Sequence, residues 1–348
     1  MTPETLTLLQ TFIKAISSAS DLSWVKAKFD EFLLKTDPQD ALFVAGAFAL
    51  ANPFYLPTME AQSAERLKIG FSEFAATILR AKLTASRAHQ TNILVACSPK
   101  SASTFISGSL RRSLNLPDAK LMAPSLHAQT IYSMGITLRE QETDELALIQ
   151  HGTNGIGYVA QHHVRCTPYL CRQLDLYKIR PIVTYRNVFD SIRSLDDMIL
   201  SQRMKQDVDR PVEQVYFADS LPLKYPDLDE ETRLGMLVER YGAWYLHFYL
   251  SWKRCEAMGL VKPFWISYER DFLGDKEVLA RRLAAFLGED IVSGDTLATC
   301  FSDMDSAKKE RLNKGVAGRG SQMPDSIRAR VLAAFEPYFD EADFSEIL

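Results

Sequence analysis

Four short apolar runs, separated by stretches with helical spacing, most strongly limit how this 348-residue chain can fold. The runs are typical of buried strands and comprise Thr91–Cys97, Gly157–Gln161, Ile179–Tyr185 and Pro263–Ser267. Helices are expected between and after them, over Pro168–Leu176, Val188–Arg203, Glu231–Met258 and Asp271–Leu287. Strands that alternate with helices favour a parallel sheet covered on both faces. The sequence therefore predicts an α/β fold with a central parallel sheet flanked by helices.

The residues before the first run have a purely helical pattern. Apolar residues at helical spacing, punctuated by prolines, predict helices over Thr5–Ile16, Leu22–Leu34, Pro38–Ala51 and Ala61–Ser86. No cluster of chemically active residues stands out among them. We therefore predict two domains, an all-α N-terminal extension over residues 1–90 and an α/β domain over residues 91–348.

Composition narrows the classes of protein to consider. Hydrophobic residues make up 47% and charged residues 24% of the chain, as in an ordinary globular protein. The net charge of -4 argues against a protein whose whole surface binds nucleic acid, so local basic clusters must carry any anion recognition. No leader pattern and no apolar run of membrane-spanning length is seen, so we expect a cytoplasmic protein with no membrane association. The five cysteines form no CxxC pair, which argues against a disulfide framework or a structural zinc site.

The segment "VACSPKSASTFISGSLRR" places a polar loop between a predicted strand and a predicted helix. Backbone N–H groups at such a junction have no partner within the helix, and the helix dipole favours an anion there. Lys100 adds a positive charge, and the hydroxyls of Ser101, Ser103 and Thr104 add donors. A Walker A motif needs two glycines and ends in Lys-Ser or Lys-Thr, whereas this loop has no glycine and its lysine comes early. It predicts a phosphate-binding loop, and the alternative is a serine-rich cap on an ordinary helix.

The segment "RPIVTYRNVFDSIRSL" repeats this strand-to-helix design. Arg186 follows the strand, and Ser194 lies eight residues later, about two turns into the helix. A guanidinium at a strand end can bind a second phosphate bidentately. The alternative is an arginine paired with a neighbouring carboxylate, such as Asp190 or Asp196.

Together these motifs resemble those of the cytosolic sulfotransferases, which use 3′-phosphoadenylyl sulfate (PAPS) as sulfuryl donor. "SPKSASTF" resembles the family's 5′-phosphosulfate loop, and "YRNVFDSIRS" resembles its 3′-phosphate motif. "WISYERDF" is similar to a Tyr-Glu-Asp segment near the adenine, "NKGVAGRG" to a late Arg-Lys-Gly-x-x-Gly loop, and "WYLHFYLSWKR" to the helix before the Tyr-Glu strand. The motifs follow the family's order from Thr91 to about Gly320.

The resemblance implies a P-loop-like sulfotransferase fold, with PAPS bound, 3′-phosphoadenosine 5′-phosphate (PAP) left as product and no metal required. It implies a donor-binding set of Lys100, Ser101, Ala102, Ser103, Thr104, Phe105, Arg186, Ser194, Tyr268, Asn313, Lys314 and Gly315. Two positions depart from the family pattern: Ala102 replaces a glycine, and Asn313 replaces an arginine. Arg319, six residues further on, could compensate for that lost charge.

The candidate catalytic base lies in "YVAQHHVRCTPYL", which resembles the family's Lys-Thr-His-Leu-Pro segment. Aligning on the strand favours His163 as base, with His162 in the threonine position and Gln161 in the lysine position. Adjacent strand residues face opposite sides, so one of the two histidines is expected to face the substrate. Glu142 and Glu145 are alternative bases, and Lys100 would also stabilise charge on the bridging oxygen.

The predicted activity is therefore transfer of a sulfuryl group from PAPS to a hydroxyl or amine of a small-molecule acceptor. A nucleotide-dependent small-molecule kinase and a non-catalytic nucleotide-binding or scaffold protein remain alternatives. The sequence does not identify the acceptor, does not distinguish O- from N-sulfation, and gives no oligomeric state.

Overall fold

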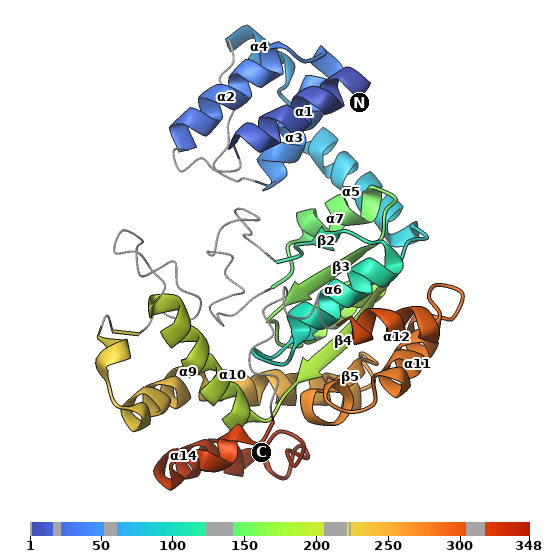
Figure 1. Ribbon diagram of the computed structural model, residues 1–348. Coiled ribbons are helices and arrows are strands. Elements are labelled where there is room, and N and C mark those ends of the chain that lie inside the picture. Colours follow the sequence, from blue (N-terminus) through green and yellow to red (C-terminus); the bar gives the residue numbers. More distant parts are fainter. Residues whose placement is uncertain are drawn as a thin grey trace. The chain divides into compact units, whose positions relative to one another are not determined.

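The structure, a computed structural model, describes residues 2–16, 22–51, 61–122, 142–204, 221–222, 224–303 and 317–348 (Figure 1). Within these ranges the chain divides into two compact units, one of residues up to Arg80 and one of residues from Ala81 on. The division falls inside a helix, ten residues before the domain boundary that the sequence suggests, and that boundary stays a prediction.

The first unit is helical. Its helices are α1 (Pro3–Ile16), α2 (Leu22–Leu34), α3 (Pro38–Ala51), α4 (Ala61–Arg66) and the first part of α5 (Phe71–Arg87). The first three share a small core of Phe12, Phe29, Phe32 and Val44. The single helix expected over Ala61–Ser86 is wrong, because the chain leaves helical geometry between α4 and α5. Gly70 lies in this break, and a glycine inside a helix costs about 1 kcal/mol relative to alanine.

The second unit is built on a five-stranded sheet, in which every pairing is parallel. The strands are β1 (Asn92–Cys97), β2 (Asp118–Ala119), β3 (Tyr158–His162), β4 (Ile179–Tyr185) and β5 (Phe264–Ser267), in the order β2-β3-β1-β4-β5. This confirms the predicted α/β class with a central parallel sheet flanked by helices. The two-residue strand β2 was not predicted, because it is too short to form an apolar run. Between β3 and β4 the chain crosses from one side of β1 to the other, so the strand order reverses at β1.

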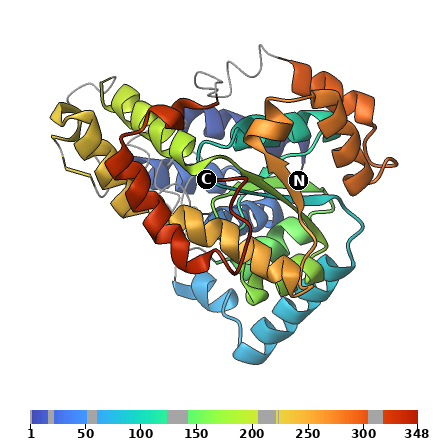
Figure 2. The same cartoon turned by 90° about the horizontal axis from the view of Figure 1, so that it is seen from below.

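Helices cover both faces of the sheet (Figures 1 and 2). They are α6 (Ser103–Leu114), α7 (Glu145–Thr153), α8 (Pro168–Leu176), α9 (Val188–Met204), α10 (Glu230–Ala257), α11 (Lys276–Leu287), α12 (Gly294–Ser302) and α14 (Asp325–Phe335). The helix expected over Asp271–Leu287 is wrong at its start. Tyr268–Phe272 forms a π-helical turn instead, and α11 begins after Asp275, whose carboxylate accepts hydrogen bonds from the N–H groups of Glu277 and Val278.

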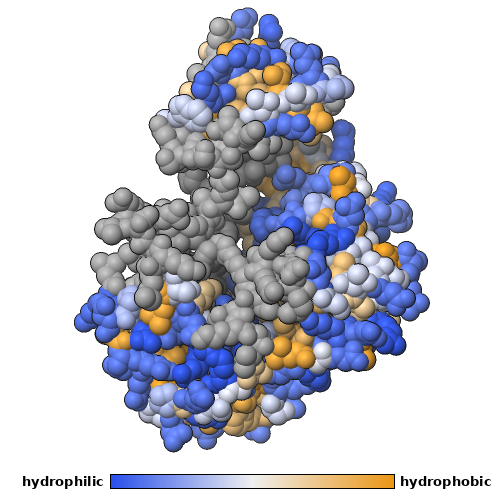
Figure 3. Space-filling view, in the orientation of Figure 1, coloured by the Kyte–Doolittle hydropathy of each residue, from blue (hydrophilic) through white to orange (hydrophobic). Residues whose placement is uncertain are grey.

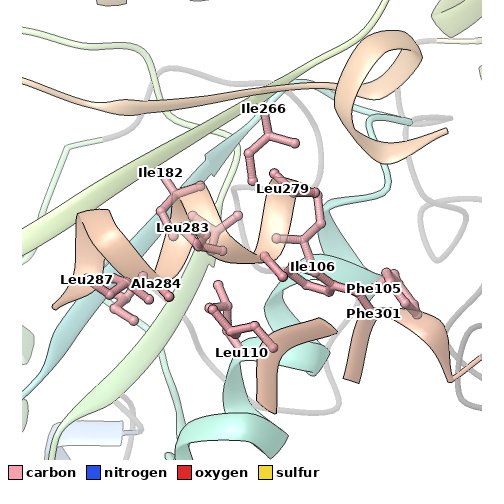
Figure 4. Close-up of a cluster of buried hydrophobic side chains, with 14 of the residues drawn as sticks. Phe105, Ile106, Leu110, Ile182, Ile266, Leu279, Leu283, Ala284, Leu287 and Phe301 are labelled. Atoms are coloured by element: carbon pink, nitrogen blue, oxygen red, sulfur yellow. The ribbon is translucent and has the colours of Figure 1, made fainter. Parts of the chain in front are cut away.

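One face of the sheet carries the core that fixes α6 and the loop before it. Alternate strand residues such as Ile182 and Ile266 pack against Leu283 of α11 and Leu110 of α6 (Figure 4). All four side chains are fully buried. Full burial of an Ile or Leu side chain contributes about 1.5–3 kcal/mol, so this core holds α6 and α11 against the sheet.

The opposite face packs against α10, along which α14 lies (Figure 2). The ring of Tyr249 on α10 lies 5.5 Å from the rings of both Tyr185 and Trp265. Trp252 Nε1 donates to the carbonyl oxygen of Val164 at 3.1 Å, which ties α10 to the segment after β3.

The described surface in Figure 3 is mostly hydrophilic, with apolar residues in small separate groups. None of the helices in the described ranges combines the length and the apolar character that crossing a bilayer requires.

Candidate functional site

The loop from Ser98 to Ala102 is fixed to the neighbouring strand β4 by hydrogen bonds. The Ser98 N–H donates to the carbonyl oxygen of Thr184 at 2.9 Å. The Ser101 hydroxyl donates to the Ser98 carbonyl at 2.6 Å and lies 2.7 Å from Thr184 Oγ1. Because Ser101 is buried, its side chain holds the shape of the loop.

The backbone of this loop has the geometry of an anion-binding nest. Lys100 and Ala102 have positive φ angles of 68° and 60°, whereas Ser101 between them does not. Such alternation turns successive N–H groups toward one concave side, where they can bind an anion. Ala102 is also the cap residue of α6, and its methyl side chain offers the first turn of that helix no capping hydrogen bond. The N–H groups of this turn and the helix dipole therefore add to the same donor set.

The left-handed conformation of Ala102 gives a prediction about stability. A residue with a Cβ in this region is strained by roughly 1–2 kcal/mol, while glycine adds about 0.4–1 kcal/mol of unfolded-state entropy. We therefore expect Ala102→Gly to raise the free energy of unfolding by about 0.5–1 kcal/mol in urea denaturation. The matched control is Ala329→Gly, at an exposed position inside α14, which should lower it by about 1 kcal/mol. Equal losses in both variants would contradict strain at Ala102.

Arg186, which directly follows β4, contacts the loop that follows β1. Its Nη1 donates to the Lys100 carbonyl at 3.2 Å, and its guanidinium lies 4.0 Å from the centre of the Tyr268 ring. Its Nη2 lies 3.4 Å from Asp190 Oδ2, and its Nε lies 3.8 Å from Glu269 Oε1. Arg186 is only 5% exposed, so a buried cation lies at the carboxyl ends of β1, β4 and β5.

Asp190 is one of the two carboxylates that the sequence suggested as partners of Arg186. The other, Asp196, pairs instead with Arg233, whose Nε lies 3.0 Å from Asp196 Oδ1. Ser194 is buried on α9 beyond Asp190, two turns from Arg186 as expected.

The end of the late glycine-bearing segment is attached to α9 through Asp190. The carboxylate of Asp190 accepts hydrogen bonds from the N–H groups of Gly318, at 2.8 Å, and Gly320. A side chain at residue 320 would overlap Phe189 and the Asp190 backbone, so the close approach requires glycine. Arg319, suggested as a compensating charge, pairs with Asp197 at 2.7 Å. Asn313, Lys314 and Gly315 lie outside the described residues.

His163 lies between the ends of β3 and β1. Its Nδ1 is 2.8 Å from the Cys97 carbonyl oxygen and 3.3 Å from Cys97 Sγ. A carbonyl only accepts, so Nδ1 carries the hydrogen and Nε2 holds the lone pair of the neutral ring. Burial lowers the pKa of His163, but the Cys97 sulfur and the hydrogen bonds to Cys97 raise it by more. The pKa therefore lies above its ordinary value of 6.5.

His162 has a different environment, on the other side of the strand. Its Nε2 accepts a hydrogen bond from the Leu121 N–H at 3.0 Å, and the residue is buried. Burial, reinforced by the charge of Lys120, lowers the pKa of His162 to about 3. The ring is therefore neutral, and its acceptor nitrogen is engaged by the protein backbone.

Gln161 stands where the resemblance places a lysine, and it contacts the first two residues of α6. Its Nε2 lies 2.9 Å from Ser103 Oγ and 3.5 Å from Thr104 Oγ1. Ser103 is buried, whereas Thr104 is exposed at the start of α6. Of the alternative bases, Glu145 interacts with Lys82 and Tyr177, and Glu142 Oε1 accepts from Thr167 at 3.4 Å.

The two aromatic residues of the expected donor-binding set, Phe105 and Tyr268, lie in the protein core. Phe105 is 2% exposed, and its ring packs against Phe272 and, as Figure 4 shows, lies beside Phe301. Tyr268 is 3% exposed and stacks on Phe272 at 5.2 Å, with the Arg186 guanidinium also over its ring.

The described site residues therefore meet at one edge of the sheet, where β1, β3, β4 and β5 end. In open parallel sheets, ligands bind outside the carboxyl ends of the strands where the strand order reverses. Sequence reasoning missed three contacts here: Asp190 to the late segment, Gln161 to Ser103, and Cys97 to His163. Asp190, Gln161, Ser103 and His163 each stood out in the sequence for another role, but nothing in the sequence predicted these three contacts.

No protein-family model matches the chain, and a search of curated proteins gives no match either.

Proposed function

We propose that this chain is a PAPS-dependent sulfotransferase that transfers a sulfuryl group to a hydroxyl or amine of a small molecule. The observation that carries the proposal is the contact of Arg186 with both the Lys100 carbonyl and the Tyr268 ring. Three segments that resemble sulfotransferase motifs, far apart in the sequence, thus come together through one buried guanidinium. A backbone nest and a buried cation at adjacent strand ends suit a ligand that carries two separate phosphate groups.

The proposed reaction is an in-line displacement at sulfur. The acceptor oxygen or nitrogen bonds to sulfur as the bond from sulfur to the bridging phosphate oxygen breaks, and PAP leaves. The N–H groups of the loop and the charge of Lys100 stabilise the negative charge that develops on the leaving phosphate. His163 accepts the acceptor's proton at Nε2, while the Cys97 carbonyl holds Nδ1–H and fixes the ring. Ser101 positions the loop rather than binding the donor.

Binding and turnover together test this proposal. Titration calorimetry of the full chain with PAP should show one binding site, and labelled PAPS should transfer its sulfuryl group to members of a panel of hydroxylated and amino metabolites. Absence of PAP binding would contradict the proposal. Tight PAP binding without transfer to any acceptor would instead indicate a non-catalytic nucleotide-binding protein, and magnesium-dependent ATP turnover would indicate a kinase.

His163 gives a prediction about pH. A protonated ring cannot accept a proton, so turnover should fall about tenfold per pH unit below the pKa of His163. Because that pKa is raised, the decline should begin above pH 6.5. Cys97→Ala removes the sulfur that raises the pKa and should move the decline to lower pH, as measured in kcat profiles. A decline that is unchanged in Cys97→Ala and present in His163→Ala would show that another group is titrating.

A further inference from the structure

Three cysteines outside the candidate site converge inside the second unit. Cys166 lies between β3 and α8, Cys171 lies on α8, and Cys255 lies on α10. Their sulfur atoms all lie within 4.8 Å of one another, and the Sγ atoms of Cys166 and Cys171 are 3.4 Å apart. The three residues are 4%, 3% and 2% exposed. Their spacing in the sequence does not group them. Cys166 and Cys171 lie five residues apart, and Cys255 lies on a helix far along the chain.

The backbone around these thiols is held in place on all sides. The Cys166 N–H donates to Ser251 Oγ of α10 at 3.0 Å, and Trp252 of α10 donates to the Val164 carbonyl at 3.1 Å. The hydroxyl of Thr167 caps α8 by accepting from the Leu170 N–H at 3.0 Å. The cluster is thus arranged before any ligand arrives, which lowers the cost of binding.

The spacing of the sulfurs matches a metal centre better than a disulfide. Three sulfurs placed about 2.3 Å from one ion in a plane lie about 4 Å apart, so shifts of less than about 1 Å would complete the site. A disulfide requires a sulfur–sulfur distance of about 2.05 Å and would leave one of the three thiols over. All three cysteines are reduced in this structure.

The number and type of ligands select the ion. Thiolates favour soft ions such as Cu(I) and Zn(II). Structural Zn(II) takes four ligands, but no further His, Cys, Asp or Glu joins the three among the residues that the structure describes. The thiols are buried, which leaves little room for water as a fourth ligand. We propose that Cys166, Cys171 and Cys255 form a three-thiolate site for a soft, three-coordinate monovalent ion, Cu(I).

Charge and proton balance follow from this assignment. Each sulfur that binds Cu(I) exchanges its S–H proton for the metal, so up to three protons enter the solvent and no atom changes oxidation state. Protons compete with the metal for the same sulfur atoms, so binding depends on pH. Cys166 immediately precedes the cap of α8, and the positive end of that helix dipole offsets part of the thiolate charge.

The test uses the reduced full-length chain without oxygen, with Cu(I) supplied by the chromogenic chelator bicinchoninate. We expect one Cu(I) per chain to be removed from the chelator. Cys166→Ala, Cys171→Ala and Cys255→Ala should each weaken binding by at least roughly 100-fold. The matched control is Cys300→Ala on α12, outside the cluster, which should bind as the unaltered chain does. Affinity should also fall by about tenfold per pH unit, on acidification, for each proton that binding releases.

If a variant fails to fold, X-ray absorption spectroscopy of the copper-loaded unaltered chain still tests the site. Three sulfurs at about 2.3 Å would support the site. Failure to compete with the chelator, binding that depends on Cys300, or a shell dominated by nitrogen or oxygen would overturn it. Zn(II) that displaces Cu(I) at equal concentration would overturn the choice of ion. The site stands independently of the sulfotransferase proposal, since none of these measurements involves turnover.

Discussion

On the proposed mechanism, Lys100→Met is expected to lower sulfuryl-transfer turnover by roughly 100- to 1,000-fold, which is the typical loss when an enzyme is deprived of one charge-stabilising donor. Methionine keeps the length of the side chain and removes its charge. The loop should keep its shape, because backbone contacts from Ser98 and Arg186 and the Ser101 hydroxyl hold it. The measurement is kcat with labelled PAPS, alongside the urea midpoint of unfolding.

A second lysine provides the matched control for this change. Lys253 on α10 is also partly buried, with its ammonium group 4.2 Å from the centre of the Trp265 ring, and it lies outside the candidate site. Lys253→Met should leave kcat unaltered, and Lys100→Arg should retain more activity than Lys100→Met because it keeps the charge. Near-normal transfer by Lys100→Met would remove Lys100 from the proposed mechanism.

The strands of this fold are readable from the sequence because their signal is local. Each predicted run is apolar on both faces, and in the structure each lies within one residue of its predicted ends. Helix ends are harder to predict from the sequence, because single residues that disfavour or cap a helix decide where it begins and ends. One predicted helix is interrupted between Arg66 and Phe71, where Gly70 lies, and Asp275 caps α11 four residues after its predicted start.

The positions of the two cations in the candidate site could be predicted from the sequence, but the contacts that support them could not. Lys100 and Arg186 follow predicted strands, and parallel strands bring their carboxyl ends to one edge. Asp190, by contrast, accepts hydrogen bonds from two backbone N–H groups more than a hundred residues away. Every residue type except proline offers such a donor, so no pattern in the sequence predicts this contact. The same holds for the three cysteines, whose meeting depends on how α8 packs on α10.

The second large effect is expected from replacing Arg186, which should lower both the stability of the fold and the affinity for the ligand. Arg186→Ala would leave Asp190, which is 2% exposed, without its cation, although Gly318 and Gly320 would still donate to it. Removing one partner of a buried ion pair typically costs about 3–5 kcal/mol. We therefore expect the free energy of unfolding in urea to fall by about 3 kcal/mol.

If Arg186 also binds the donor, Arg186→Ala should weaken PAP binding by at least about 30-fold in calorimetry, which corresponds to about 2 kcal/mol. Arg233→Ala separates this effect from instability, because Arg233, although partly exposed, pairs with the buried carboxylate of Asp196 and lies outside the candidate site. Both variants should be destabilised, and only Arg186→Ala should lose affinity for PAP. Equal PAP affinity in the two variants would reduce Arg186 to a structural residue. The double variant Arg186→Ala with Asp190→Asn should recover part of the lost stability without recovering PAP binding, because it removes the uncompensated charge, keeps an acceptor oxygen next to Gly318 and Gly320, and restores no cation.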